Sequence, residues 1–425
     1  MDAELHTRKR FILAFWLFVL SAISFLDRTN ISIAGLQISS EFGLGNQRLG
    51  WIFSAFLIGY AGCQVPAGWL ASRFGPRLVI AFGVIWWGVT TAITTLIPPG
   101  FSQAVTLLIA IRFALGAGEA VIYPAANQFV ARWVPEHERG VVNGLIFAGV
   151  GAGSGLTPPL LAWFILHHGW RSAFWFSAVI GVIAGAVWWW LARDTPEEDP
   201  TVSAAELKLI REGIADDKSE ESAPGAISWR AILTRRDLPA LIITYFGFGY
   251  TAWIFFSWFF LYMAQVRGFD LKSSAMFSML PFLCMTFGCL AGGVISDRLT
   301  KAYGLRVGRC GLASVAYIFT AIFLVLGSRT SSPQLAGVIL AGGAGALYIS
   351  QSSFWSVSAD IAGRSSGVFS SMVNMGAQIG GAVTASLTPW VAQRFGWTTS
   401  FGIAAALAAL GAVLWMTVHP ERPLA

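Results

Sequence analysis

Apolar runs of about 20 residues recur along the whole chain, and this feature restricts the fold more than any other. Each run is long enough to cross a ~30 Å hydrocarbon core as a helix. Only 12% of the 425 residues are charged, whereas soluble proteins carry about 25%. A transmembrane β-barrel would need alternating segments of ~10 residues, which the chain lacks. We predict an all-α, multi-pass membrane protein with twelve spans, at about residues 11–38, 47–72, 78–97, 103–131, 141–166, 171–192, 238–266, 272–296, 308–328, 333–359, 365–393 and 397–418.

Lysine and arginine are unevenly distributed between the predicted loops. Most of the 28 lie at the N-terminus, in the even-numbered loops and at the C-terminus. Because cytoplasmic loops carry an excess of these residues, we expect both chain ends in the cytoplasm. An even number of spans agrees with this orientation. The net charge of +6 follows from the same bias and does not indicate a nucleic-acid partner.

Cysteine and histidine do not indicate a metal site. The four cysteines lie in or next to apolar segments, and the five histidines lie in predicted loops or tails. Neither set has the spacing of metal ligands. The spans contain no nucleophile paired with a base, and the chain has no phosphate-binding loop. We therefore expect no metal, no cofactor and no catalytic residues, and neither an enzyme nor an ATP-driven pump.

Residues 194–237 interrupt the apolar pattern with many charged residues, proline and glycine. We interpret this segment as a cytoplasmic linker between an N-terminal six-helix bundle, residues 1–193, and a C-terminal six-helix bundle, residues 238–425. Ser203-Ala-Ala-Glu206 has the pattern of a capping box that begins a short amphipathic helix. The linker is too short for an output domain, which argues against a membrane sensor.

The two predicted bundles repeat each other in sequence. Gly68-Trp-Leu-Ala-Ser72-Arg73 follows span two, and Gly293-Val-Ile-Ser-Asp297-Arg298 follows span eight. Leu-Thr-Pro followed by Gly-Trp joins spans five and six, and again spans eleven and twelve. Six spans separate the equivalents, so both repeats have the same orientation. This arrangement is typical of transporters whose binding site lies at the membrane midplane between two bundles.

Ionisable residues lie inside predicted spans of the first bundle, namely Asp27, Arg28, Arg112 and Glu119. A charge at the bilayer centre costs about 2.5–3.5 kcal/mol on insertion scales, so we expect these residues to face a wet cavity. The seven-residue spacing within the second pair places its members on nearly the same helix face. Other polar residues extend the set, namely Tyr123 and Asn127 in span four and Tyr60 and Gln64 in span two.

This constellation predicts the binding of an anion coupled to protons. An arginine offers two parallel donors to a carboxylate, and a buried carboxyl group gains proton affinity when a neighbouring arginine is occupied. The alternative is that Asp27–Arg28 and Arg112–Glu119 are mutually neutralising structural pairs. We favour coupling because the second bundle has no charge clearly in the middle of a span.

The second bundle supplies uncharged candidates for substrate contact. Asn374 and Gln378 are one turn apart in span eleven, where they suit substrate hydroxyls or, equally, hydrogen bonds between helices. Span seven is rich in aromatic residues, most of which we expect to pack or to face lipid. Tyr250, Trp253 and Trp355 are candidates for contact with the substrate.

Over essentially its whole length the chain resembles the major facilitator superfamily, and within it the anion:cation symporter branch. That branch includes bacterial sugar-acid symporters, sialin and the vesicular glutamate transporters. The resemblance rests on Phe25-Leu-Asp27-Arg28-Thr29-Asn30 in span one, Tyr60 to Trp69 in span two, Arg112-Phe-Ala-Leu-Gly116-Ala-Gly-Glu119 through Tyr123-Pro124 to Asn127 in span four, and Trp133-Val-Pro135-Glu136-His-Glu138-Arg139 after it.

The resemblance implies proton-driven uptake of an organic anion across a bacterial inner membrane. It implies that Arg28 binds substrate and that Asp27 and Glu119 carry the coupled protons. It further implies that Arg112 is held by Glu119, and that Tyr60 and Asn374 line the cavity.

Three positions depart from the branch. The gating loop that contains Arg73 and Arg77 normally has an aspartate at Ser72, whereas the second repeat keeps Asp297 and Arg298. Sugar-acid symporters often carry a tyrosine in place of Phe25 and a glutamine in place of Gly149. The loss of these polar groups favours a less hydroxylated or bulkier anion, such as an aromatic or dicarboxylic acid.

We therefore predict a monomeric, proton-coupled symporter of an organic anion, a carboxylate or sugar acid, that works by alternating access within membrane lipid. An exchanger or exporter of organic anions with the same fold is the alternative.

Overall fold

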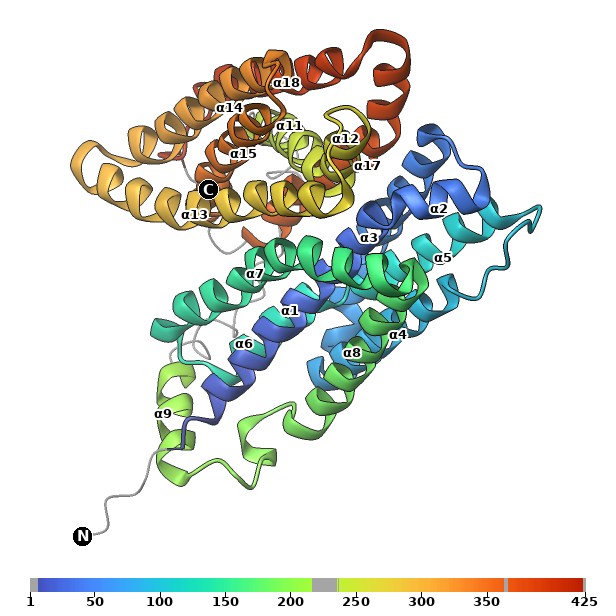
Figure 1. Cartoon of the computed structure of the whole chain (residues 1–425). Helices are drawn as coiled ribbons and strands as arrows, with labels where there is room; N and C mark the ends of the chain where they lie inside the picture. The colour runs from blue at the N-terminus through green and yellow to red at the C-terminus, as the bar shows by residue number, and fades with distance from the viewer. Residues whose placement is uncertain (1–6, 216–234, 236, 363–365, 423–425) are drawn as a thin grey trace. The chain divides into compact units, whose positions relative to one another are not determined.

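The computed structural model describes residues 7–215, 235, 237–362 and 366–422, and these residues are almost entirely helical, without a β-strand (Figure 1). The helices of the first half are α1 (Lys9–Ile33), α2 (Gly35–Phe42), α3 (Asn46–Phe74), α4 (Pro76–Thr94), α5 (Ala104–Glu119), α6 (Ile122–Trp133), α7 (Glu136–His168) and α8 (Trp170–Leu191). The linker contains η1 (Pro196–Glu198) and α9 (Ala204–Ala215). The second half contains α11 (Asp237–Ser257), α12 (Phe259–Gln265), α13 (Leu271–Tyr303), η3 (Arg306–Gly311), α14 (Leu312–Arg329), α15 (Pro333–Ile349), α16 (Gln351–Ala362), α17 (Ser366–Phe395) and α18 (Trp397–Trp415).

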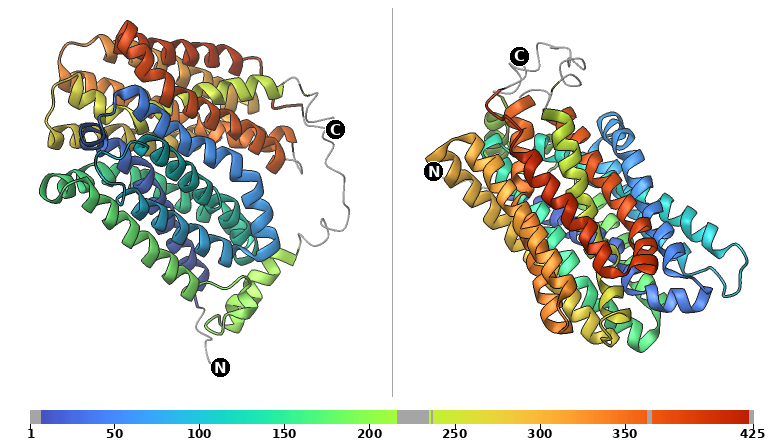
Figure 2. Two further views of the ribbon diagram at one scale, coloured as in Figure 1. Left: turned by 90° about the vertical axis from the view of Figure 1, so that its right-hand side faces the viewer. Right: turned by 90° about the horizontal axis from the view of Figure 1, so that it is seen from above.

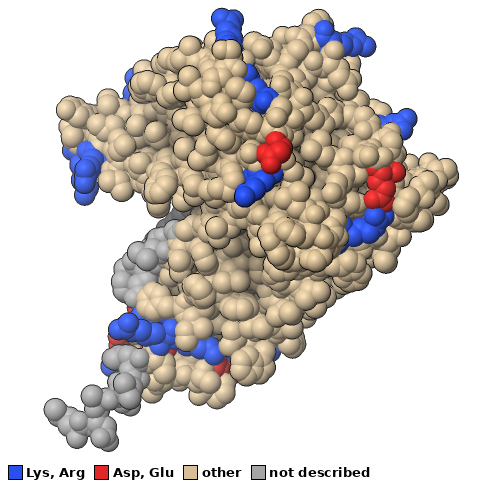
Figure 3. Space-filling view, in the orientation of Figure 1, with Lys and Arg blue, Asp and Glu red and all other residues tan. Residues whose placement is uncertain are grey.

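The described helices are those of a multi-pass membrane protein. Ten helical segments are long and apolar enough to cross a membrane. The helices α3, of 29 residues, and α17, of 30 residues, are also long enough, and they lie where the sequence predicts spans two and eleven. On the face shown in Figure 3, charged side chains are sparse and broad areas carry none. The prediction of a twelve-span, all-α membrane fold is consistent with these helices.

Four of the predicted spans are each interrupted once, which the hydropathy pattern does not show. The breaks fall at Ala34 between α1 and α2, at Ala120 between α5 and α6, at Trp258 between α11 and α12, and at Ser350 between α15 and α16. These are spans one, four, seven and ten, so the breaks recur six spans apart, as the sequence repeat requires. Pro124 explains the second break, because proline cannot donate to the carbonyl four residues earlier and its ring clashes with it.

Glycines permit close helix packing at equivalent places in the two repeats. A Cβ on Gly149 of α7 would collide with the main-chain oxygen of Phe18 in α1. A Cβ on Gly380 of α17 would likewise collide with the main-chain oxygen of Phe246 in α11. The repeated small residues of spans five and eleven therefore let these helices approach spans one and seven closely.

The helices group into two compact units. Unit 1 consists of Met1–Arg28, Gly59–Gly153 and Arg171–Ala226, and unit 2 of Thr29–Ile58, Ser154–Trp170 and Ile227–Ala425. The boundaries fall inside α1, α3 and α7, whereas the predicted domains end at the linker; the division at 193 and 238 remains a prediction. Within unit 2, α14 lies alongside α15 and α18 (Figure 2).

Each unit has an aromatic core. In unit 1 the ring of Phe129 stacks on Trp133, with centroids 5.4 Å apart, and meets Trp188 edge-on at 4.9 Å. In unit 2 the ring of Phe354 lies 4.1 Å from Tyr245 and 4.6 Å from Trp415. Trp188 of α8 is remote in sequence from Phe129 and Trp133, which both lie on α6. Tyr245 of α11 and Trp415 of α18 are likewise remote from Phe354 of α16, so each cluster joins distant spans.

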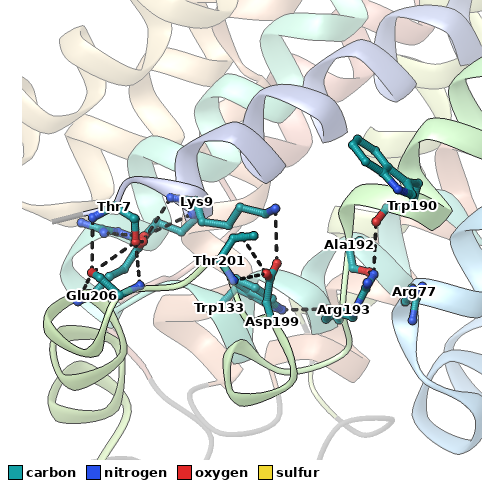
Figure 4. A network of polar contacts seen from close by, with 12 residues as sticks. Thr7, Lys9, Arg77, Trp133, Trp190, Ala192, Arg193, Asp199, Thr201 and Glu206 are labelled. Carbon is teal, nitrogen blue, oxygen red and sulfur yellow. Dashed lines mark hydrogen bonds and ion pairs between the residues drawn. The ribbon is translucent and has the colours of Figure 1, made fainter. Parts of the chain in front are cut away.

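The N-termini of α1 and α9 cap each other (Figure 4). The predicted capping box is half formed, because the Glu206 N–H donates to Ser203 Oγ at 3.2 Å. The Glu206 carboxylate instead accepts from the main-chain N–H groups of Lys9 and Arg10, at 3.1 and 3.2 Å, and pairs with the Arg10 guanidinium at 3.0 Å. In return, the Ser203 N–H donates to Thr7 Oγ1 at 2.9 Å. The linker therefore supplies the cap of the first membrane helix.

A second ion pair ties the linker to the same helix end (Figure 4). Lys9 Nζ lies 3.3 Å from Asp199 Oδ2, and the Thr201 N–H and hydroxyl donate to Asp199 Oδ1 at 2.9 and 2.6 Å. Burial opposes ionisation of Asp199, but the hydrogen bonds from Thr201 and the charge of Lys9 outweigh it and hold the pKa of this carboxyl below its ordinary value.

Replacing Glu206 by alanine should destabilise unit 1 strongly. The carboxylate is fully buried and Arg10 is 8% exposed, and removal of one partner of a buried ion pair costs about 3–5 kcal/mol. We expect a clear fall in the thermal midpoint of the purified protein in detergent, and a smaller fall for Glu206→Gln, which still accepts hydrogen bonds. The matched control is Glu212→Ala on the same helix, whose side chain is 69% exposed and which should leave the midpoint unchanged. An unchanged midpoint in Glu206→Ala would contradict the capping role.

Candidate anion and proton site

A buried ion pair lies at the centre of the candidate site in unit 1. Arg28 Nε of α1 donates to Glu119 Oε2, at the last residue of α5, over 2.7 Å. Arg28 is 6% exposed and Glu119 is fully buried. Each of these buried charges stabilises the other, because a buried charge without a partner costs several kcal/mol of folding free energy.

Two aromatic rings flank the guanidinium of Arg28. Its Cζ lies 4.4 Å from the ring centroid of Phe25, one turn earlier on α1, and 4.6 Å from that of Tyr60 on α3. Both rings are buried, and cation–π contact with them stabilises the charge and fixes its plane. The sequence predicts Tyr60 at the site. It identifies Phe25 only as a position where related symporters carry a tyrosine, so the contact of the Phe25 ring with Arg28 is a new finding.

Asp27 and Arg112 lie beside this pair. Asp27 is fully buried, and its Oδ1 accepts a hydrogen bond from the Thr91 hydroxyl of α4 at 3.2 Å. Arg112 is 2% exposed, and its Nη1 lies 3.5 Å from the main-chain oxygen of Asp27. The four ionisable groups of the first bundle therefore meet in one buried cluster. The sequence predicts that these residues face a wet cavity, and their burial corrects that expectation. Glu119 pairs with Arg28, whereas the resemblance implies that Glu119 holds Arg112. Thr91 is a member that the sequence analysis did not name.

Other polar residues of the first half lie around this cluster with different exposure. Tyr123 of α6 is half-buried; its hydroxyl lies 3.0 Å from Ser21 Oγ of α1, and its ring stacks on Phe147 with centroids 5.3 Å apart. Gln64 is half-buried and Asn127 is exposed. Tyr123 and Asn127 lie in α6, beyond the break at Ala120, whereas Arg112 and Glu119 lie in α5.

The candidate residues of the second half belong to unit 2. Trp355 of α16 is 41% exposed, whereas Asn374 and Gln378 of α17 are half-buried. Tyr250 of α11 is buried and Trp253 is half-buried. Contact of these side chains with substrate remains a prediction.

The predicted gating residues lie at helix ends. Arg73 is exposed near the end of α3, and its guanidinium lies over the ring of Trp69. The main-chain N–H of Arg77 donates to Asp194 Oδ1 at 2.9 Å, next to Gly75. Gly75 has φ +84°, a conformation that favours glycine.

In the second repeat Asp297 pairs with Arg309 at 3.2 Å. The same arginine reaches Asp360 at 3.7 Å, and Arg298 is exposed. Ion pairs of this kind join helix ends, which suits a gate, although the gating role is a prediction. In the part of the chain that the structure describes, no group of three or more His, Cys, Asp or Glu side chains is placed to hold a metal ion.

Comparison with known proteins identifies the family. The sequence profile of the Major Facilitator Superfamily matches residues 17–377. The chain is 32% identical over 400 residues to a probable sulfoacetate transporter of Cupriavidus necator, covering 94% of this chain and 91% of that protein. It is 28% identical over 437 residues to a D-galactonate transporter of Escherichia coli, covering 98% and 97%.

The solved structures agree on the fold. A bacterial homologue of the human lysosomal transporter Spinster, in an inward-facing and unoccupied conformation, superimposes with a TM-score of 0.78 at 17% identity, covering 97% of each chain. With helices of this kind, the family profile and transporters as relatives, the chain is a transporter rather than an enzyme. It belongs to the Major Facilitator Superfamily.

Proposed function

We propose that this transporter carries an organic anion together with protons. The observation that carries the proposal is the buried Arg28–Glu119 ion pair with Asp27 beside it. A substrate carboxylate that binds Arg28 competes with Glu119 for the same donor. Once displaced, the Glu119 carboxylate is a buried charge without its cation, and protonation relieves that cost.

This exchange couples the two solutes in a simple way. With the anion on Arg28, Glu119 is protonated. The proton offsets one negative charge of the anion, so the loaded site carries less added charge than it would with either solute alone. When the anion leaves, Arg28 returns to Glu119 and the proton is released. Asp27, also fully buried, provides a second place for a proton next to the same arginine.

The chemistry of the site favours acids with few hydroxyl groups. The relatives are named as transporters of sulfoacetate and D-galactonate, which are both carboxylates. Around Arg28 of this chain one flanking ring is that of Phe25, which carries no hydroxyl. We propose as substrate an aromatic or dicarboxylic acid, or another acid with few hydrogen-bond donors. We also propose that both chain ends are cytoplasmic and that the protein works as a monomer.

Uptake into proteoliposomes with an imposed pH gradient tests the proposal. A panel of carboxylates, including a sugar acid, a dicarboxylate, an aromatic acid and sulfoacetate, should contain at least one compound that accumulates when the outside is acidic. Neutral analogues of that compound should not be transported. If a carboxylate exchanges freely but its accumulation ignores the pH gradient, the protein is an exchanger and the symport proposal is wrong.

A further inference from the structure

Thr91 bonds differently from the other threonines at the end of α4. Threonine in a helix usually donates its hydroxyl to a carbonyl three or four residues earlier in the same helix. Thr90 donates to Trp86 and Trp87, and Thr94 donates to Thr90, in this way. Thr91 instead donates across to Asp27 Oδ1 on α1 at 3.2 Å.

The place of this hydrogen bond gives it importance. Thr91 and Asp27 are both fully buried, so neither water nor a surface charge screens the contact. The charged groups that face Asp27 come from α5, where Arg112 lies 3.5 Å from its main-chain oxygen and Glu119 contributes a second negative charge. Its neighbour Arg28 is engaged with Glu119. Thr91 is the neutral donor that reaches the Asp27 carboxylate from α4.

A hydroxyl donor discriminates between the two protonation states of a carboxyl group. Hydrogen bonds to an ionised acceptor are roughly twice as strong as those between neutral groups. The Thr91 hydroxyl therefore stabilises the ionised form of Asp27 more than the protonated form. It also fixes the carboxylate through Oδ1, which holds the side chain against α4.

We propose that Thr91 is a positioning residue that sets the pH at which Asp27 takes up and releases its proton. The proposal rests on the proposed proton coupling and adds to it the element that tunes this step. Helix α4 thereby participates in coupling, although it contributes no ionisable side chain to the cluster.

The test compares the pH dependence of uptake in Thr91 variants reconstituted in proteoliposomes. Thr91→Val keeps the shape of the side chain and removes the donor. We expect the pH of half-maximal gradient-driven uptake to move upward by about one unit, the size expected for losing a hydrogen bond to a charged group. Counterflow exchange of the same anion should continue. Thr91→Ser, which restores the hydroxyl, should return the midpoint to the wild-type value.

Thr90→Val is the matched control, because it removes a buried hydroxyl that bonds within its own helix. Its midpoint should equal that of the wild type. If Thr91→Val does not fold, Thr91→Ala takes its place and the same comparison decides. A wild-type midpoint in the donor-free variant, or an equal shift in Thr90→Val, would overturn the role of Thr91. Failure of the proposed function looks different: uptake by the wild-type protein would itself be independent of pH.

Discussion

Arg28→Gln should lose at least about 100-fold in affinity for the anion that the uptake panel identifies. A bidentate contact supplies two charge-assisted hydrogen bonds, each worth about 1.5–3 kcal/mol, and tenfold in affinity corresponds to about 1.4 kcal/mol. Arg28→Lys should also bind weakly, because an ammonium group cannot reproduce the planar fork. Its compact charge also matches the space between the rings of Phe25 and Tyr60 poorly. Isothermal titration of the purified protein measures both effects.

The stability of these variants must be separated from their affinity. Arg28→Gln leaves Glu119 buried without its cation, which costs about 3–5 kcal/mol of folding free energy. The double variant Arg28→Gln/Glu119→Gln removes both charges, and we expect it to recover most of the thermal midpoint. It should still fail to bind. Binding of the anion by a folded double variant with unchanged affinity would show that Arg28 does not anchor the substrate.

Glu119→Gln should uncouple transport from the proton gradient. Glutamine keeps an oxygen that can accept from Arg28 Nε, where Glu119 Oε2 now lies at 2.7 Å, but it cannot take up a proton. A gradient of one pH unit is worth about 1.4 kcal/mol per proton, so the wild type should concentrate its substrate about tenfold per coupled proton. The variant should equilibrate the substrate without concentrating it. Exchange of labelled for unlabelled substrate should persist.

Glu212→Gln provides the comparison for this experiment, since it makes the same chemical change on the exposed face of α9. That protein should accumulate substrate as the wild type does. Should Glu119→Gln still concentrate substrate against its gradient, the coupled proton must be carried elsewhere, and Asp27 would be the next group to replace by asparagine.

The sequence predicts the fold well because the information is carried by long segments. A run of about 20 apolar residues identifies a span regardless of its neighbours, and the repeated motifs around Arg73 and Arg298 relate the halves. The helix breaks are harder to predict. Pro124 is a local cause for the break at Ala120, but the equivalent break at Ser350 has no proline four residues later. Local sequence alone does not place it.

The candidate site is predicted in part for a similar reason. Asp27, Arg28, Arg112 and Glu119 are conspicuous in the sequence because charges are rare in membrane spans, and the structure brings them together. Nothing in the sequence distinguishes Thr91 from Thr90. The direction of each hydroxyl depends on how α4 is rotated against α1, which is a property of tertiary packing.

The linker shows how a local motif can find a distant partner. The capping-box pattern predicts that Glu206 bonds within its own helix. In the structure its carboxylate instead accepts hydrogen bonds from the main-chain N–H groups of Lys9 and Arg10 in α1. Short-range patterns identify residues that cap helices, but they do not establish which helix is capped.

The reciprocal caps of α1 and α9 have a consequence for biosynthesis. Thr7 and Glu206 are 199 positions apart, so the first helix leaves the ribosome long before its capping carboxylate exists. The N–H groups of Lys9 and Arg10 therefore lack this hydrogen-bond acceptor until the first half of the protein and the linker have been translated. The N-terminus of α1, the first helix to be synthesised, is thus capped only after the first half of the protein is complete.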